Sequence, residues 1–156
     1  ITPRLEGELK DGRYSILHIA THGQFATDVN QSFLLTFDDK LTMTQLERLV
    51  GLFRFRQDPL ELLTLSACQT GIGDDRAALG LAGIAVKAGA RSALATLWFI
   101  NDEASSELVS EFYRQLHDTS ISKARALQLA QLKLLSDRLY EHPAYWAAFL
   151  LFNNWL

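Results

Sequence analysis

The sequence predicts an α/β fold in which a mainly parallel sheet is covered by helices on both faces. Short apolar runs, typical of strands buried on both sides, alternate along the chain with segments of helical periodicity. Strands that alternate with helices favour a parallel sheet, because each helix carries the chain back across one face. The chain has 156 residues, of which 48% are hydrophobic, so we expect residues 1–156 to form one domain with its own core.

The first predicted strand is Tyr14–Ala20, an almost unbroken apolar run that ends at Thr21-His22-Gly23. Ser32–Phe37 predicts a second extended segment. A short helix follows, and either Thr42 or Thr44 could cap it, since a threonine hydroxyl accepts a hydrogen bond from an amide of the first turn.

The middle of the chain predicts a strand, a loop and a helix in that order. Leu60–Ala67 is the strand, and it leads directly to Cys68. Gln69–Asp75 contains two glycines and predicts a loop. Ala77–Ala88 has helical composition, and Gly89 suits the C-cap because glycine adopts a positive φ without strain.

The last part of the chain predicts a strand, two helices and a closing strand. The predicted bounds are a strand over Ala93–Trp98, a helix capped by Asn101 or Asp102 and ending at Leu116, a helix from Ile121 or Ser122 to about Leu139, and a strand over Trp146–Phe152.

Composition excludes several classes of protein. The net charge of -3 is spread along the chain without a basic stripe, which disfavours nucleic acid as a partner. No apolar stretch approaches the roughly 20 residues that span a bilayer. A single cysteine forms no internal disulfide and suits a reducing compartment, so we expect a cytoplasmic protein. The absence of a Cys/His cluster at ligand spacing argues against a structural zinc site. The chain lacks an initiating methionine, and we expect it to be the C-terminal part of a longer polypeptide.

Cys68 and His22 each follow an apolar strand, and this is the arrangement that carries chemistry. Ligands of open α/β sheets gather at the carboxyl ends of strands, so the two side chains can meet if their strands are neighbours. An imidazole within hydrogen-bond reach converts a thiol into a nucleophilic thiolate and later protonates the leaving group. The backbone amides of Gly23 and Cys68 are the candidate donors to the oxyanion.

Six short motifs, spread over nearly the whole chain, occur in the same order as in a known protein family. They are His18-Ile19-Ala20-Thr21-His22-Gly23, Ser66-Ala67-Cys68-Gln69-Thr70-Gly71, Gly80-Leu81-Ala82-Gly83, Ala88-Gly89-Ala90-Arg91-Ser92, Leu97-Trp98 and His142-Pro143-Ala144-Tyr145-Trp146-Ala147-Ala148-Phe149. With these motifs the chain resembles the CHAT domain, a bacterial caspase-like and separase-like cysteine peptidase module. In caspases a histidine lies about 50 residues before the catalytic cysteine, and here the separation is 46.

The resemblance implies a caspase-like three-layer α/β/α sandwich and a cysteine endopeptidase with a Cys68–His22 dyad. It implies hydrolysis of a protein or peptide substrate without a metal or cofactor, and tetratricopeptide repeats elsewhere in the full-length protein. The family usually has another strand and helix before Tyr14, and we expect these to be missing. The loop containing Trp98, Asn101 and Asp102 is expected to bind substrate, where Asp102 either selects a basic residue or caps the next helix.

The sequence supports one alternative function and two further interpretations of single features. The chain could be a non-catalytic caspase-like interaction module whose groove binds or regulates a partner. His18 is interpreted as a buried, hydrogen-bonded structural histidine, because a strand places it too far from His22 for a simple pair. The aromatic residues around Trp146 are interpreted as a core strand, although an uncovered apolar surface there could support a homodimer.

Overall fold

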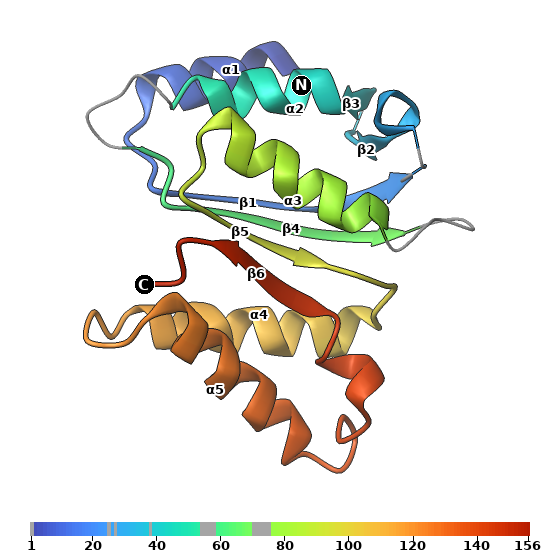
Figure 1. Ribbon diagram of the computed structural model, residues 1–156, viewed down its shortest axis with the longest axis vertical. Helices are drawn as coiled ribbons and strands as arrows, with labels where there is room; N and C mark the ends of the chain where they lie inside the picture. The colour runs from blue at the N-terminus through green and yellow to red at the C-terminus, as the bar shows by residue number, and fades with distance from the viewer. Residues whose placement is uncertain (1, 25, 27, 38, 54–58, 70–75) are drawn as a thin grey trace.

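The computed structural model describes most of the chain, as Figure 1 shows. The described residues are 2–24, 26, 28–37, 39–53, 59–69 and 76–156, and for residues 2, 3, 11, 29, 67–69 and 76–81 the description covers the backbone. The predicted loop over residues 70–75 lies outside this part of the chain.

Strands and helices alternate through the described residues. The strands are β1 (Ile16–Gln24), β2 (Phe33–Leu35), β3 (Lys40–Thr42), β4 (Leu62–Gln69), β5 (Ser92–Thr96) and β6 (Phe149–Asn153). The α-helices are α1 (Thr2–Asp11), α2 (Met43–Gly51), α3 (Arg76–Ala88), α4 (Asp102–Leu116) and α5 (Lys123–Leu135), and the short 3₁₀ turns are η1 (Val29–Gln31) and η2 (Pro143–Tyr145).

One sheet of six strands, in the order β3-β2-β1-β4-β5-β6, separates two layers of helices. Helices α1, α2 and α3 cover one face, and α4 and α5 lie on the other (Figure 1). The predicted caspase-like α/β fold is confirmed. The central strands β1, β4 and β5 are parallel, whereas β2, β3 and β6 add antiparallel pairs at the two edges, so the sheet is mixed.

Local hydrogen bonds fix several helix ends as the sequence predicts. Thr42 caps α2 in a capping box with Gln45, whose side chain accepts a hydrogen bond from the Thr42 amide. Ser122 caps α5 by accepting a hydrogen bond from the Arg125 amide. The chain leaves α3 at Gly89, whose φ of 118° is one that glycine adopts without strain.

Alternate residues of the central strands supply two cores, one on each face of the sheet. Leu63 on β4 packs with Leu46 and Phe53 in the core beneath α1, α2 and α3. Its neighbour Leu62 packs on the opposite face with Phe112 beneath α4 and α5. This is the outcome expected of strands buried on both sides, and it fixes the register of β4, because a shift of one residue would exchange the faces.

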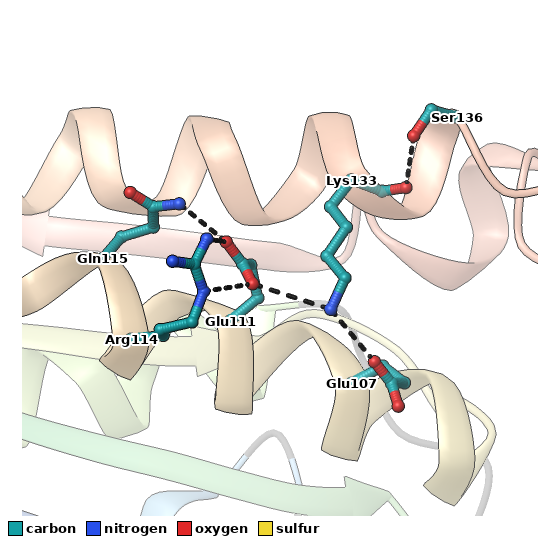
Figure 2. Close-up of polar contacts among 6 residues, drawn as sticks. All are labelled: Glu107, Glu111, Arg114, Gln115, Lys133 and Ser136. Carbon is teal, nitrogen blue, oxygen red and sulfur yellow. Dashed lines mark hydrogen bonds and ion pairs between the residues drawn. The ribbon is translucent and has the colours of Figure 1, made fainter.

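A polar network joins α4 to α5 on the outer side of the second core (Figure 2). The Glu111 carboxylate, only 6% exposed, accepts hydrogen bonds from Arg114 Nε at 2.9 Å and Gln115 Nε2 at 2.6 Å. Lys133 Nζ on α5 lies 3.5 Å from Glu111 and 3.3 Å from Glu107. Each buried oxygen therefore has a donor, which is what permits a carboxylate at this position.

Candidate active site

The backbone pairing of β1 and β4 brings the two predicted dyad residues together. Parallel pairing runs from Ile16 opposite Leu62 to Gly23 opposite Gln69, and within it the Cα atom of His22 is the partner of that of Cys68. Both strands extend further than the sequence predicts, because β1 continues to Gln24 and β4 to Gln69. His22 and Cys68 thus lie inside the ladder, near its carboxyl end, rather than in the turns beyond.

A pocket of about 480 Å³ opens beside His22, between β1 and α4. From the sheet it is lined by His18, Ala20, Thr21, His22 and Ser66. From α4 it is lined by Asp102, Ser105, Ser106, Val109, Ser110 and Tyr113. Eight of the eleven described lining residues carry a hydroxyl group or an imidazole, so the pocket offers hydrogen-bond partners to a ligand.

The pocket exists because the helices on this face do not cover all of the sheet. Helices α4 and α5 lie over the β4–β5–β6 side of this face, while the adjacent face of β1 is left open (Figure 1). Ile16, His18, Ala20 and His22, which alternate along β1, are accordingly exposed on this face. The open strand face and the side of α4 form the two walls of the pocket.

His18 is one of the residues in this pocket, and the interpretation of it as a buried structural histidine was wrong. It is exposed, and its Nε2 lies 2.8 Å from Ser66 Oγ, at hydrogen-bond distance. Its ring also packs against Tyr113, with 5.6 Å between the ring centroids. Partial burial against these groups lowers the pKa of His18 below its usual 6.5, because desolvation disfavours the imidazolium.

Tyr113 is anchored to the sheet through its phenol group. Its hydroxyl donates a hydrogen bond of 2.8 Å to Oγ1 of Thr64, which is only 1% exposed. Burial raises the pKa of Tyr113 above its usual 10.0, so the phenol is neutral throughout the physiological range. The pairing of Tyr113 with Thr64 holds the ring that His18 packs against.

The loop after β5 gives its three predicted substrate-binding residues different positions. Asn101 is the N-cap of α4, since its Oδ1 accepts hydrogen bonds from the Glu103 and Ala104 amides. Trp98 Nε1 donates to the Ala144 carbonyl at 3.0 Å. Neither is among the residues that line the pocket, whereas Asp102, the first residue of α4, is. Asn101 therefore serves as the cap, and Asp102 is part of the pocket wall.

Gly23, the predicted oxyanion donor next to His22, is buried within the sheet. It pairs with Leu34 on β2 and with Gln69 on β4. Cys68, the second predicted donor, is described through its backbone. Their roles at an oxyanion stay predictions.

The sequence analysis did not find the polar wall on α4, although the pattern is visible. Positions 102, 105, 106, 109, 110 and 113 recur at helical spacing and carry Asp102, Ser105, Ser106, Val109, Ser110 and Tyr113. Leu108 and Phe112 form the apolar stripe of the same helix, which packs in the core. A second, serine-rich stripe on a helix that packs on a sheet indicates a surface turned toward a cavity.

Within the described part of the chain, no three His, Cys, Asp or Glu side chains are grouped as metal ligands would be. None of the described helices has the length and apolar character to cross a membrane.

A helix-covered α/β sheet with a histidine and a cysteine in register on neighbouring parallel strands is compatible with a caspase-like fold. A model of the CHAT domain family matches residues 2–154. The chain therefore belongs to the CHAT domain family, as the sequence motifs predict. A search of curated proteins gave no match.

Proposed function

We propose that this chain is a cysteine endopeptidase domain that hydrolyses peptide bonds of a protein substrate. The observation that carries the proposal is the register of β1 and β4, in which His22 and Cys68 are direct partners beside a pocket of about 480 Å³. Membership of a family related to caspase-like peptidases supports the same reaction.

In the proposed reaction, His22 takes the thiol proton of Cys68, and the thiolate attacks the carbonyl carbon of the scissile bond. The backbone amides of Gly23 and Cys68 are the proposed donors to the oxyanion. His22 then donates its proton to the leaving amine as the C–N bond breaks, which leaves a thioester on Cys68. Water, deprotonated by His22, hydrolyses the thioester and restores the free thiol.

Asp102 is the residue that we propose to set the substrate preference. It is the one acidic side chain among the described residues lining the pocket, and no described lysine or arginine lines it. A carboxylate attracts a cation, so the pocket would favour a basic residue before the scissile bond. Trp98 and Asn101 would then act by holding the loop that presents Asp102.

The test is covalent labelling by an irreversible thiol-directed peptide inhibitor, followed by mass spectrometry. We expect the inhibitor to modify Cys68, and His22→Ala to reduce the labelling rate by about 100-fold or more, as loss of a general base does. His117→Ala is the matched control, since His117 is exposed at the carboxyl end of α4, away from the pocket lining. Equal rates in the His22→Ala and wild-type proteins would contradict the assigned role.

The same experiment separates an enzyme from an interaction module. A peptide library presented to the purified protein, with Cys68→Ala in parallel, should show cleavage that depends on Cys68. Labelling without any Cys68-dependent cleavage would instead favour a module that binds peptides without turning them over.

A further inference from the structure

His18 and Ser66 form a hydrogen-bonded pair in the pocket, on the sheet wall beside the proposed dyad. Ser66 lies two residues before Cys68 on β4, a distance of about 6.6 Å along a strand. Ser66 lies opposite Ala20 in the strand register, two residues beyond His18. The His18 side chain extends along the strand toward Ser66, since its Nε2 lies 2.8 Å from Ser66 Oγ. The pair therefore stands about one long side chain away from the proposed nucleophile.

The remaining contacts hold the imidazole in place. Tyr113 packs on it from α4, and Tyr113 is itself hydrogen-bonded to buried Thr64. Ser110 lines the same pocket from the α4 side. A neutral imidazole and these hydroxyl groups together offer acceptors for an ammonium or guanidinium group, which brings donors and no acceptor.

We propose that His18, paired with Ser66, is a specificity-determining residue that contacts the head group of a lysine or arginine side chain preceding the scissile bond. This proposal rests on the proposed function, because it places the substrate by the Cys68–His22 dyad. The stem of such a side chain would lie along Ala20. Shorter side chains would leave the His18–Ser66 pair uncontacted.

Protonation of His18 then opposes binding of the cation. The ionisable groups that line the pocket around it are His22 on β1 and Asp102 and Tyr113 on α4. Tyr113 stays neutral, because burial raises its pKa. Since the pKa of His18 is lowered, the imidazole is neutral at pH 7 and becomes a cation only as the pH falls below 6.5. Basic substrates should lose their advantage over the same range.

The experiment compares two matched peptides that carry arginine or citrulline before the scissile bond, because citrulline has the shape of arginine without its charge. The ratio of their kcat/KM values is measured from about pH 5 to pH 8, the range in which histidine titrates. Steps that are common to the two peptides cancel in the ratio, and a variant of His18 separates this residue from the other groups of the pocket. We expect the ratio to fall about tenfold toward acid pH, the change that one pKa unit of repulsion produces.

Two variants test whether His18 is the cause. His18→Gln keeps a polar side chain without the titration, so the ratio should become independent of pH. His117→Gln removes an exposed histidine outside the pocket lining and should keep the wild-type profile. A flat ratio in the wild type, or an unchanged profile in His18→Gln, would overturn the proposal.

A binding measurement keeps the test independent of turnover. In the Cys68→Ala protein, the pKa of His18 is followed by NMR with and without each peptide. Linkage requires the arginine peptide to lower this pKa by about one unit and the citrulline peptide to leave it unchanged. Absence of cleavage of both peptides would refute the proposed endopeptidase activity. The same pKa of His18 with both peptides would refute the role of His18.

Discussion

Thr64 and Tyr113 show at the scale of single residues how a polar pair is tolerated between the sheet and α4. The Thr64 hydroxyl is 1% exposed and accepts a hydrogen bond from Tyr113. Tyr113→Phe should lower the free energy of unfolding by about 1–2 kcal/mol, because it leaves the threonine hydroxyl buried without this donor. Urea denaturation at neutral pH measures the change.

The double variant gives this prediction a sharper form. Thr64→Val with Tyr113→Phe removes both polar partners while keeping their shapes. The free energy of unfolding should therefore fall by less than the sum of the losses in the two single variants. Additive losses in the double variant would show that the hydrogen bond does not couple the two side chains.

His18 marks the limit of sequence reasoning at this scale. The sequence shows two histidines four residues apart on a strand, and strand periodicity places them on one face. Whether that face is covered depends on how far α4 extends across the sheet, which is a tertiary property. The proximity of His22 and Cys68 along the backbone was easier to predict, since the ends of parallel strands meet at one edge of a sheet whatever covers its faces.

At the scale of elements, the α4–α5 pair depends on the charge of Glu111. Hydrogen bonds from Arg114, together with those from Gln115 and the nearby Lys133, lower the pKa of Glu111 from 4.5 to about 2. A carboxyl group whose pKa is lowered by folding stabilises the protein above the unfolded pKa and loses this effect as the pH falls toward the folded pKa. The contribution should therefore be complete above about pH 4.5 and decline between pH 4.5 and pH 2.

The measurement compares the wild type with Glu111→Gln in urea denaturation series at several pH values. The difference in unfolding free energy should be largest near pH 7 and shrink as the pH falls through this window. Glu107→Gln is the matched control: Glu107 also contacts Lys133, but its side chain is 55% exposed, so we expect a change below about 1 kcal/mol. A difference for Glu111→Gln that stays constant down to pH 2 would contradict the assignment.

Elements with strong local signals could be predicted, and those with weak signals could not. Thr42, Ser122 and Gly89 have side chains or backbone freedom that define helix ends by themselves. The strand β2 lies within the predicted extended segment Ser32–Phe37, whereas β3 was not predicted, because three residues are too few to show an alternating pattern. The expectation that the helix before Tyr14 is missing was wrong, because α1 occupies Thr2–Asp11. Its polar sequence explains the error, since apolar periodicity was the signal used to predict helices.

At the scale of the whole molecule, the sheet makes two cores into one cooperative unit. Neighbouring residues of β4 enter opposite cores, as Leu62 and Leu63 show. Unfolding of one core therefore removes packing that holds β4 in the sheet, and this in turn weakens the other core. We therefore expect one unfolding transition for the whole chain rather than two.

The tryptophans offer a direct test of this cooperativity. Trp98, Trp146 and Trp155 all lie in the part of the chain after β5, so their fluorescence reports on the side of α4 and α5, whereas circular dichroism reports on all helices. Leu46→Ala truncates a fully buried side chain on α2, in the opposite core, and should cost about 2–5 kcal/mol. Because the sheet couples the cores, this change should shift the fluorescence and dichroism midpoints together. A fluorescence midpoint that stays at the wild-type denaturant concentration, while the dichroism midpoint falls, would show that the two faces unfold independently.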